Sequence, residues 1–213
     1  MKEMKQMSES FMVAVVLATV GGFLDAYTYV CRDQVFANAQ TGNIVRIGIT
    51  FANGEYLKIL RYFIPVVAFS IGIMMTIFIR NNCFKKYDLH WRQVVLIIEM
   101  IVMFIIGFIP IGKMNVVANV MVSFICSMQA ECFRKVLGKP FSSTMCTGNL
   151  RSGVEYLYQG FYYQDKNAIA NSIHYLFIIL FFILGAVLGV WITKQIYEKA
   201  IFICIIFVIM IDK

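Results

Sequence analysis

Apolar side chains along this chain occur in six runs that are separated by shorter polar segments. The runs extend from Phe11 to Val30, Tyr62 to Ile79, Val94 to Ile111, Val116 to Cys132, Ser172 to Thr193 and Ala200 to Ile211. The first five fall within the roughly 17–25 residues that a helix needs to cross about 30 Å of hydrocarbon. The sixth is shorter, so it is extended by its flanks, lies in thinned bilayer or rests against the other helices. The pattern predicts an all-α membrane protein with about six transmembrane helices.

Composition identifies the solvent that this pattern requires. Hydrophobic residues make up 60% of the chain and charged residues 15%, whereas soluble domains are about 45–50% apolar and about 25% charged. So few charges do not cover the surface of a soluble domain of this size, while a bilayer accommodates the apolar excess. Membrane lipids are therefore expected partners. The net charge of +7 is interpreted as membrane topology and headgroup contact, and nucleic acid is not an expected partner.

Basic residues indicate the orientation of the spans. With the N-terminus inside, the 19 Lys and Arg residues divide into twelve on the cytoplasmic side and seven on the other. Basic residues concentrate on the cytoplasmic side of membrane proteins. We therefore expect a multi-pass protein of the inner (plasma) membrane with both termini in the cytoplasm.

An internal repeat is the most informative feature of the chain. The tripeptide Thr-Gly-Asn occurs at residues 41–43 and again 106 residues later, at 147–149. The same offset aligns Asp25 with Glu131, so each half has one acid near the end of an apolar run. The repeated unit comprises a span, a polar turn, a short helix ending near Gly54 or Gly160, and two further spans.

The number of spans in each unit sets the relation between the halves. Three is an odd number, so the second unit enters the membrane from the opposite side and the repeat is inverted. We expect one membrane domain, residues 1–213, with a first repeat at 11–112 and a second at 116–211. Inverted repeats are widespread in secondary transporters, where the substrate binds near the repeat interface. They also occur in channels, so the repeat favours a solute pathway over any one mechanism.

Three stretches of the first half resemble a known family. They are Gly-Gly-Phe-Leu-Asp-Ala-Tyr-Thr-Tyr (21–29), Val-Phe-Ala-Asn-Ala-Gln-Thr-Gly-Asn (35–43) and Arg-Tyr-Phe-Ile-Pro-Val-Val-Ala-Phe (61–69). They are similar to the YoaK-like bacterial multi-pass membrane proteins, the family of domain of unknown function 1275. The resemblance covers most of the chain and implies a small inner-membrane protein of about six helices. The function of that family is undefined, so it implies no catalytic or substrate residue.

Polar residues in and beside the apolar runs are the candidate site. Acids within membrane helices are costly and face a bundle interior or a water-filled cavity. Asp25 and Glu131 therefore form a protonation or cation site, or else a hydrogen bond or ion pair to Arg46 or Arg151 that holds the repeats together. The full set of candidates for a substrate or ion pathway is Asp25, Glu131, Gln40, Thr41, Gly42, Asn43, Thr147, Gly148, Asn149, Arg46 and Arg151.

The two Thr-Gly-Asn turns suit helix starts. Thr or Asn caps exposed N–H groups, and the positive helix end favours an anion or a polar carbonyl. The alternative is an interfacial turn that preserves packing between the halves. Arg46 and Arg151 either hold an anionic group or extend to lipid headgroups. Glu99 lies seven residues after Arg92, which indicates an ion pair or a proton relay.

Catalytic and metal-binding patterns do not stand out in the sequence. There is no HExxH, GxSxG, Walker or dinucleotide motif. The six cysteines form no CxxC pair and mostly lie in or beside apolar runs. They are interpreted as small hydrophobic residues. We expect no enzymatic activity, no cofactor and no metal.

The sequence therefore predicts a small transporter or permease for a small polar or aromatic solute. Proton coupling and a homodimer are both compatible with the pattern. The alternative is a non-transporting membrane scaffold or accessory subunit whose polar motifs only hold the two halves together, and a channel is a weaker third hypothesis. A transporter requires a polar cavity at Asp25 or Glu131, whereas a scaffold requires dry packing there.

Overall fold

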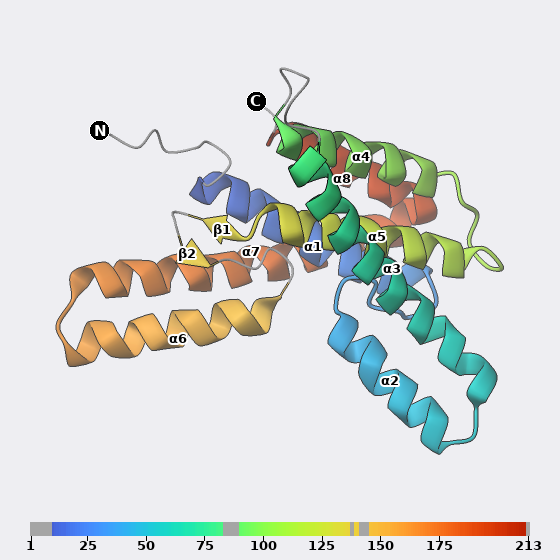
Figure 1. Ribbon diagram of the computed structural model, residues 1–213, viewed down its shortest axis with the longest axis horizontal. Helices are drawn as coiled ribbons and strands as arrows, with labels where there is room; N and C mark the ends of the chain where they lie inside the picture. The colour runs from blue at the N-terminus through green and yellow to red at the C-terminus, as the bar shows by residue number, and fades with distance from the viewer. Residues whose placement is uncertain (1–9, 83–89, 137–138, 141–144, 212–213) are drawn as a thin grey trace.

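The computed structural model describes residues 10–82, 90–136, 139–140 and 145–211 (Figure 1). Its helices are α1 (Phe11–Cys31), α2 (Gln40–Ala52), α3 (Tyr56–Asn82), α4 (Trp91–Ile106), α5 (Asn115–Cys132), α6 (Cys146–Tyr162), α7 (Lys166–Ile196) and α8 (Phe202–Ile209), with a 3-10 helix η3 (Tyr197–Ile201) before α8. The strands β1 (Lys135–Val136) and β2 (Lys139–Pro140) form one short antiparallel pair. The prediction of a helical protein is confirmed.

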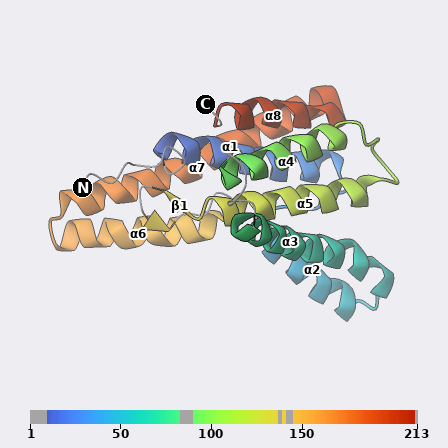
Figure 2. The same cartoon turned by 45° about the horizontal axis from the view of Figure 1, so that its top comes forward.

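Three helical segments of the described chain are long and apolar enough to cross a membrane. They are Phe11–Cys31, Tyr56–Asn82 and Lys166–Ile209. The third and fourth predicted spans coincide with the shorter helices α4 and α5, and the sixth with η3 and α8. The last of these packs against α1 and α4 (Figure 2). The three segments are consistent with a membrane protein, and α1 is central and largely buried.

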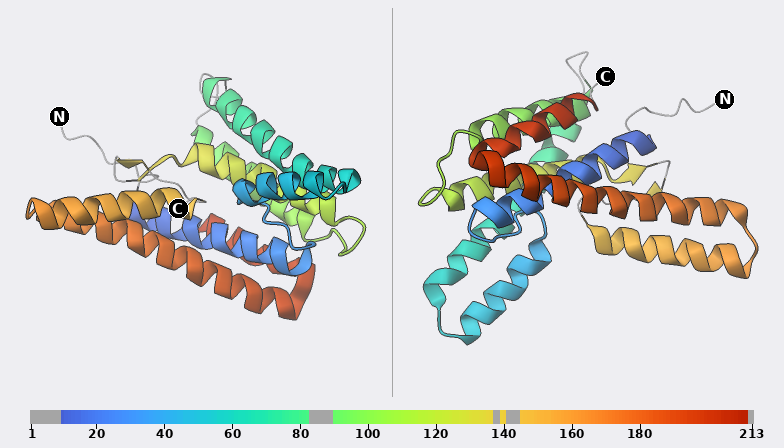
Figure 3. Two further views of the ribbon diagram at one scale, coloured as in Figure 1. Left: turned by 90° about the horizontal axis from the view of Figure 1, so that it is seen from below. Right: turned by 180° about the vertical axis from the view of Figure 1, so that it is seen from behind.

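The helices pair across the chain rather than in sequence order. Helix α1 packs along α7, and α3 packs along α5. Two hairpins, α2 with α3 and α6 with α7, extend from this centre in different directions (Figure 3). Nearly all of α1 is buried, whereas α3 and α7 expose large apolar side chains such as Leu57 and Trp191. The outer faces of α3 and α7 are therefore suited to lipid contact.

Glycines allow the paired helices to approach closely. A Cβ atom on Gly22 would overlap the carbonyl of Phe182, and one on Gly185 would overlap the carbonyl of Thr19. On the other pair, a Cβ on Gly72 would overlap Phe124 and Ser127. These glycines therefore lie at close backbone contacts between helices of the same chain. Backbone contact of this kind drives helix association where the solvent is itself apolar.

The α1–α7 contact supplies a direct test of the fold. We expect Gly185→Val to lower the free energy of unfolding by about 1–3 kcal/mol, because the added side chain forces the two backbones apart. The measurement is the thermal unfolding midpoint in detergent. The control is Gly48→Ala on α2, where an added Cβ has no atom within 4 Å, so that variant is expected to keep or slightly raise the midpoint. An equal decrease of the unfolding midpoint in the two variants would contradict the close contact between α1 and α7.

Candidate functional site

Asp25 lies at the start of α2 although it belongs to α1. It is buried, and its Oδ1 atom accepts a hydrogen bond from the backbone N–H of Asn38 at 3.1 Å. Ala39 precedes α2 and provides no side-chain cap. The carboxylate therefore occupies the helix start that the sequence predicted for an external anion, because a carboxylate compensates both the unpaired N–H groups and the positive helix end.

The start of α6 converges on the same acid. Cys146 is the first residue of α6 and lies close enough to Asp25 to respond to its charge. Partial burial, followed by the negative charge of Asp25, raises the pKa of the Cys146 thiol to about 11. The chain thus brings the starts of both Thr-Gly-Asn helices toward one carboxylate.

The Thr-Gly-Asn motifs lie inside the first turns of α2 and α6, rather than before them. The residues that precede the two helices, Ala39 and Met145, make no side-chain cap, so the expectation that Thr or Asn caps the helices is wrong. In both motifs the threonine (Thr41, Thr147) is exposed and the asparagine (Asn43, Asn149) is buried. The glycines differ, since Gly42 is half-buried and Gly148 is exposed. The asparagine is the inward-facing member of each motif.

The segment 32–39, between α1 and α2, is not helical, and Arg32, Val35, Ala37 and Asn38 within it are buried. Its backbone groups are satisfied largely by side chains of neighbouring helices. Asn119 of α5 donates to the carbonyl of Arg32 at 2.8 Å, and Ser123 of α5 donates to the carbonyl of Ala37. Irregular backbone is stable at membrane depth only where protein covers it and pairs its polar groups. The polar face of α5 therefore holds this segment in place.

The first turn of α2 completes this network. Gln40 donates to the carbonyl of Ala37 at 2.7 Å, and Asn43 donates to the carbonyl of Phe36 and to the Gln40 side-chain oxygen, both at 3.0 Å. These two candidate residues are hydrogen-bonded within the protein. Their geometry supports the interpretation that the first motif preserves packing.

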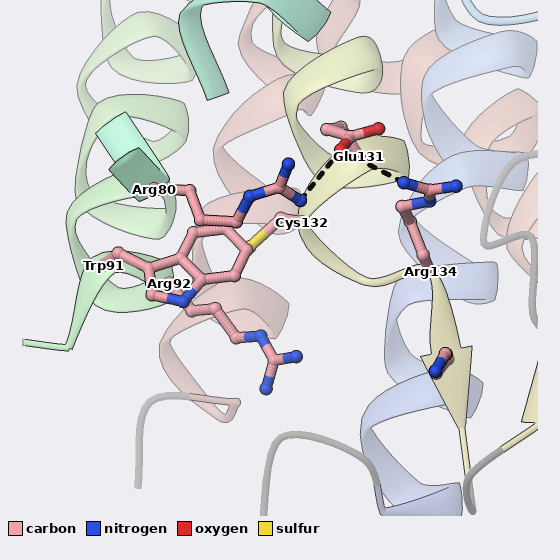
Figure 4. Close-up of a pocket in the computed structure, with 7 residues that line it drawn as sticks. Arg80, Trp91, Arg92, Glu131, Cys132 and Arg134 are labelled. Atoms are coloured by element: carbon pink, nitrogen blue, oxygen red, sulfur yellow. Dashed lines mark hydrogen bonds and ion pairs between the residues drawn. The ribbon is translucent and has the colours of Figure 1, made fainter. Parts of the chain in front are cut away.

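Glu131 is in a different setting from Asp25. It accepts ion pairs from Arg80 of α3 at 3.1 Å and Arg134 at 3.5 Å, which reach it from opposite sides (Figure 4). A pocket of about 390 Å³ adjoins these groups and is lined by Arg80, Trp91, Arg92, Glu131, Cys132, Arg134 and Lys135. Basic residues outnumber the acid in this lining, so the pocket favours a solute that carries negative charge or hydrogen-bond acceptors.

The predicted arginine partners of the acids are wrong. Arg46 stacks on the ring of Tyr62, 5.5 Å from its centroid, with its Nη1 atom 3.5 Å from the phenol oxygen. Arg151 is exposed on α6. Sequence spacing did not reveal that the end of α3 brings Arg80 to Glu131, because that contact depends on how α3 packs along α5.

Arg32 is the buried polar residue that the sequence analysis missed. Its side chain is fully buried and donates to the phenol oxygen of Tyr27 at 2.9 Å and to the carbonyls of Ile109 at 2.8 Å and Pro110 at 3.1 Å. It thereby ties the end of α1 to the segment after α4. Its position directly after an apolar run resembled that of an ordinary interfacial arginine.

A second pocket lies at the opposite end of α5. It has a volume of about 450 Å³ and is lined by Tyr29, Val30, Cys31, Asp33, Gln34, Ile111, Asn115, Thr193, Lys194 and Tyr197. Its lining includes Asn115 at the start of α5, whereas the first pocket includes Cys132 at the end of α5. None of the candidate residues from the sequence lines the second pocket.

Several buried polar atoms between the two pockets have no hydrogen-bond partner among the described residues. They include the side-chain oxygens of Asn38, Asn119 and Gln129, and both carboxyl oxygens of Glu99. The helical positions of Asn115, Asn119, Ser123 and Gln129 follow one face of α5, which we call the α5 polar stripe. A buried polar atom without a partner is unfavourable, so these atoms mark places where water or a solute would be stabilised.

Comparison with known proteins agrees with the resemblance in the first half. The model of the family described as Protein of unknown function (DUF1275) matches residues 13–211. No curated protein and no solved structure matches the chain.

The proximity of Asp25 to α6 predicts a change in thiol reactivity. We expect Asp25→Asn to increase the alkylation rate of Cys146 by a few-fold, because removal of the nearby negative charge favours the thiolate, which is the reactive form. Mass spectrometry of the alkylated peptide measures the rate. The control is Glu131→Gln, which is expected to leave the rate unchanged. An identical rate in Asp25→Asn and the unmodified protein would show that the carboxylate does not act on α6.

Proposed function

The chain belongs to the DUF1275 family, whose description names no function, and we propose that it is a small membrane transporter or permease for a small polar or aromatic solute. The proposal rests on one observation. The α5 polar stripe runs between two pockets at opposite ends of the helix, and the stripe and its surroundings retain buried polar atoms without partners. A solute or water that crosses the protein would satisfy those atoms in turn.

The arrangement of helices supports an inverted repeat as the basis of this pathway. Gln129 of α5 contacts Leu17 near the start of α1, and Asn119 contacts Arg32 at its end, so α1 and α5 run antiparallel. The third helix of each unit packs on the first helix of the other, as α7 does on α1 and α3 does on α5. This reciprocal packing between the units is the pattern expected of two units related by a two-fold axis in the membrane plane. In this proposal α4, α5 and α8 join α1, α3 and α7 to give six spans.

The pocket linings support a polar or aromatic solute. The Glu131 pocket combines cationic groups with the ring of Trp91, and the second pocket includes Tyr29 and Tyr197 beside Lys194. Aromatic rings and cations together bind planar or acceptor-rich molecules. The proposed topology puts the Glu131 pocket on the cytoplasmic side, because the ends of α3 and α5 carry the basic residues expected there.

One observation favours the alternative of a non-transporting scaffold. Gln40, Asn43 and Asp25 all bond within the protein and hold the 32–39 segment and α2. A scaffold needs only these bonds and no open pathway. The two functions differ in whether water reaches the middle of α5.

Cysteine accessibility on α5 tests the transport proposal without knowledge of the solute. In a background with Cys83→Ser and Cys146→Ser, we expect a small membrane-impermeant thiol reagent to modify Asn119→Cys, because residue 119 faces the polar stripe. Mass spectrometry after labelling from each side of oriented vesicles measures the modification. The control is Met128→Cys on the same helix, since Met128 is fully buried in the apolar core and its helical position lies opposite the polar stripe. If both variants stay unmodified from either side, the stripe is dry and the proposal fails.

A ligand screen tests the role of the Glu131 pocket. We expect some small polar or aromatic solute to raise the unfolding midpoint, since a ligand at 100 times its Kd stabilises the folded state by about 2.7 kcal/mol. Glu131→Gln is expected to reduce or abolish this shift, because Arg80 and Arg134 lose the carboxylate that positions them. The matched control is Glu155→Gln, an exposed acid on α6, which should retain the shift. If both variants kept the ligand-induced shift of the unfolding midpoint, the ligand would bind outside the Glu131 pocket.

A further inference from the structure

Glu99 is the acid with the least compensation among the described residues. It lies in the middle of α4, its side chain is fully buried, and neither of its carboxyl oxygens has a hydrogen-bond partner in the described structure. The predicted ion pair with Arg92 is absent from the described contacts. Seven residues correspond to a rise of about 10 Å along a helix, which separates the two side chains along α4.

No described hydrogen bond or ion pair balances a charge on Glu99, and Arg92 of the same helix does not bond to its carboxyl group. The apolar cluster shared by α4, α5 and α8 includes the buried thiols of Cys126, Cys132 and Cys204. On the α3 side, the charged group is Arg80, which already pairs with Glu131. An ionised carboxylate in apolar surroundings without a partner is so costly that such a group takes up a proton instead.

The three interior acids therefore differ in what surrounds them. Asp25 accepts a backbone N–H at a helix start, and Glu131 has two arginines. Each of these two acids thus has at least one described donor. Glu99 has neither kind of donor.

We propose that Glu99 is a proton-binding site, occupied in the resting protein, and that it is the group through which a proton couples to solute movement. Proton binding at Glu99 does not depend on whether the protein transports a solute, whereas the coupling role rests on the proposed function. Trp91 and Arg92 of α4 line the Glu131 pocket and precede Glu99 by about two helical turns. Water that entered from this pocket would therefore have to pass about two turns of α4 to reach Glu99.

Infrared difference spectroscopy tests the occupancy on the full chain in lipid. The spectrum of the unmodified protein minus that of Glu99→Gln is expected to contain the C=O stretch of a protonated carboxylic acid. The carboxamide has nearly the shape of the neutral acid, so the variant is expected to fold, and its unfolding midpoint is measured in parallel. The same difference with Glu131→Gln is the control and is expected to contain carboxylate bands. Carboxylate bands for Glu99 would overturn the proposal.

Exchange into D2O tests the coupling role separately from occupancy and transport. The Glu99 band is expected to shift downward in the folded protein, because a coupling proton must exchange with solvent. A band that is present but does not shift would leave a sealed, structural acid and overturn the coupling role. The Asn119→Cys labelling experiment measures water access at α5, whereas the infrared experiment measures protonation at Glu99. The transport proposal and the proton-binding proposal can therefore be contradicted separately.

Discussion

The partly buried, non-helical segment 32–39 is the constraint on which the rest of the structure depends. Its backbone groups lie inside a membrane protein and need partners that a helix would otherwise have supplied. Asp25 and the α5 residues Asn119 and Ser123 provide several of these partners. The contacts from Asn119 and Ser123 hold the polar face of α5 against this segment, and Asp25 and Thr28 hold it to α1.

This constraint also explains why the polar interior has two kinds of residue. Some polar groups, such as Gln40 and Asn43, complete the network and leave nothing to bind a solute. Others, such as the Gln129 side chain, use one atom for a helix–helix bond and leave the other without a partner. A pathway in this protein would therefore run along the α5 polar stripe, beside the predicted Thr-Gly-Asn turns rather than through them.

Much of the fold was predictable because it depends on local pattern. Apolar runs located the long helices, because each run has the length and composition of a buried or lipid-facing helix. The site was harder to predict because it depends on packing between distant segments. The spacing of the two acids suggested equivalent roles, yet Asp25 binds the start of α2 and Glu131 binds Arg80. Arg32 showed no sequence signal beyond its place after a span, since its partners are carbonyls of a segment far along the chain.

The central claim is that polar atoms along α5 form part of a hydrated route between two pockets. An experimental structure in lipid nanodiscs, at a resolution that shows ordered water, tests this most directly. The account predicts water or solute density within hydrogen-bond distance of the side-chain oxygens of Asn38, Asn119 and Gln129, continuous with at least one pocket. Side chains that close over these atoms without density, or that bond directly to one another, would contradict it.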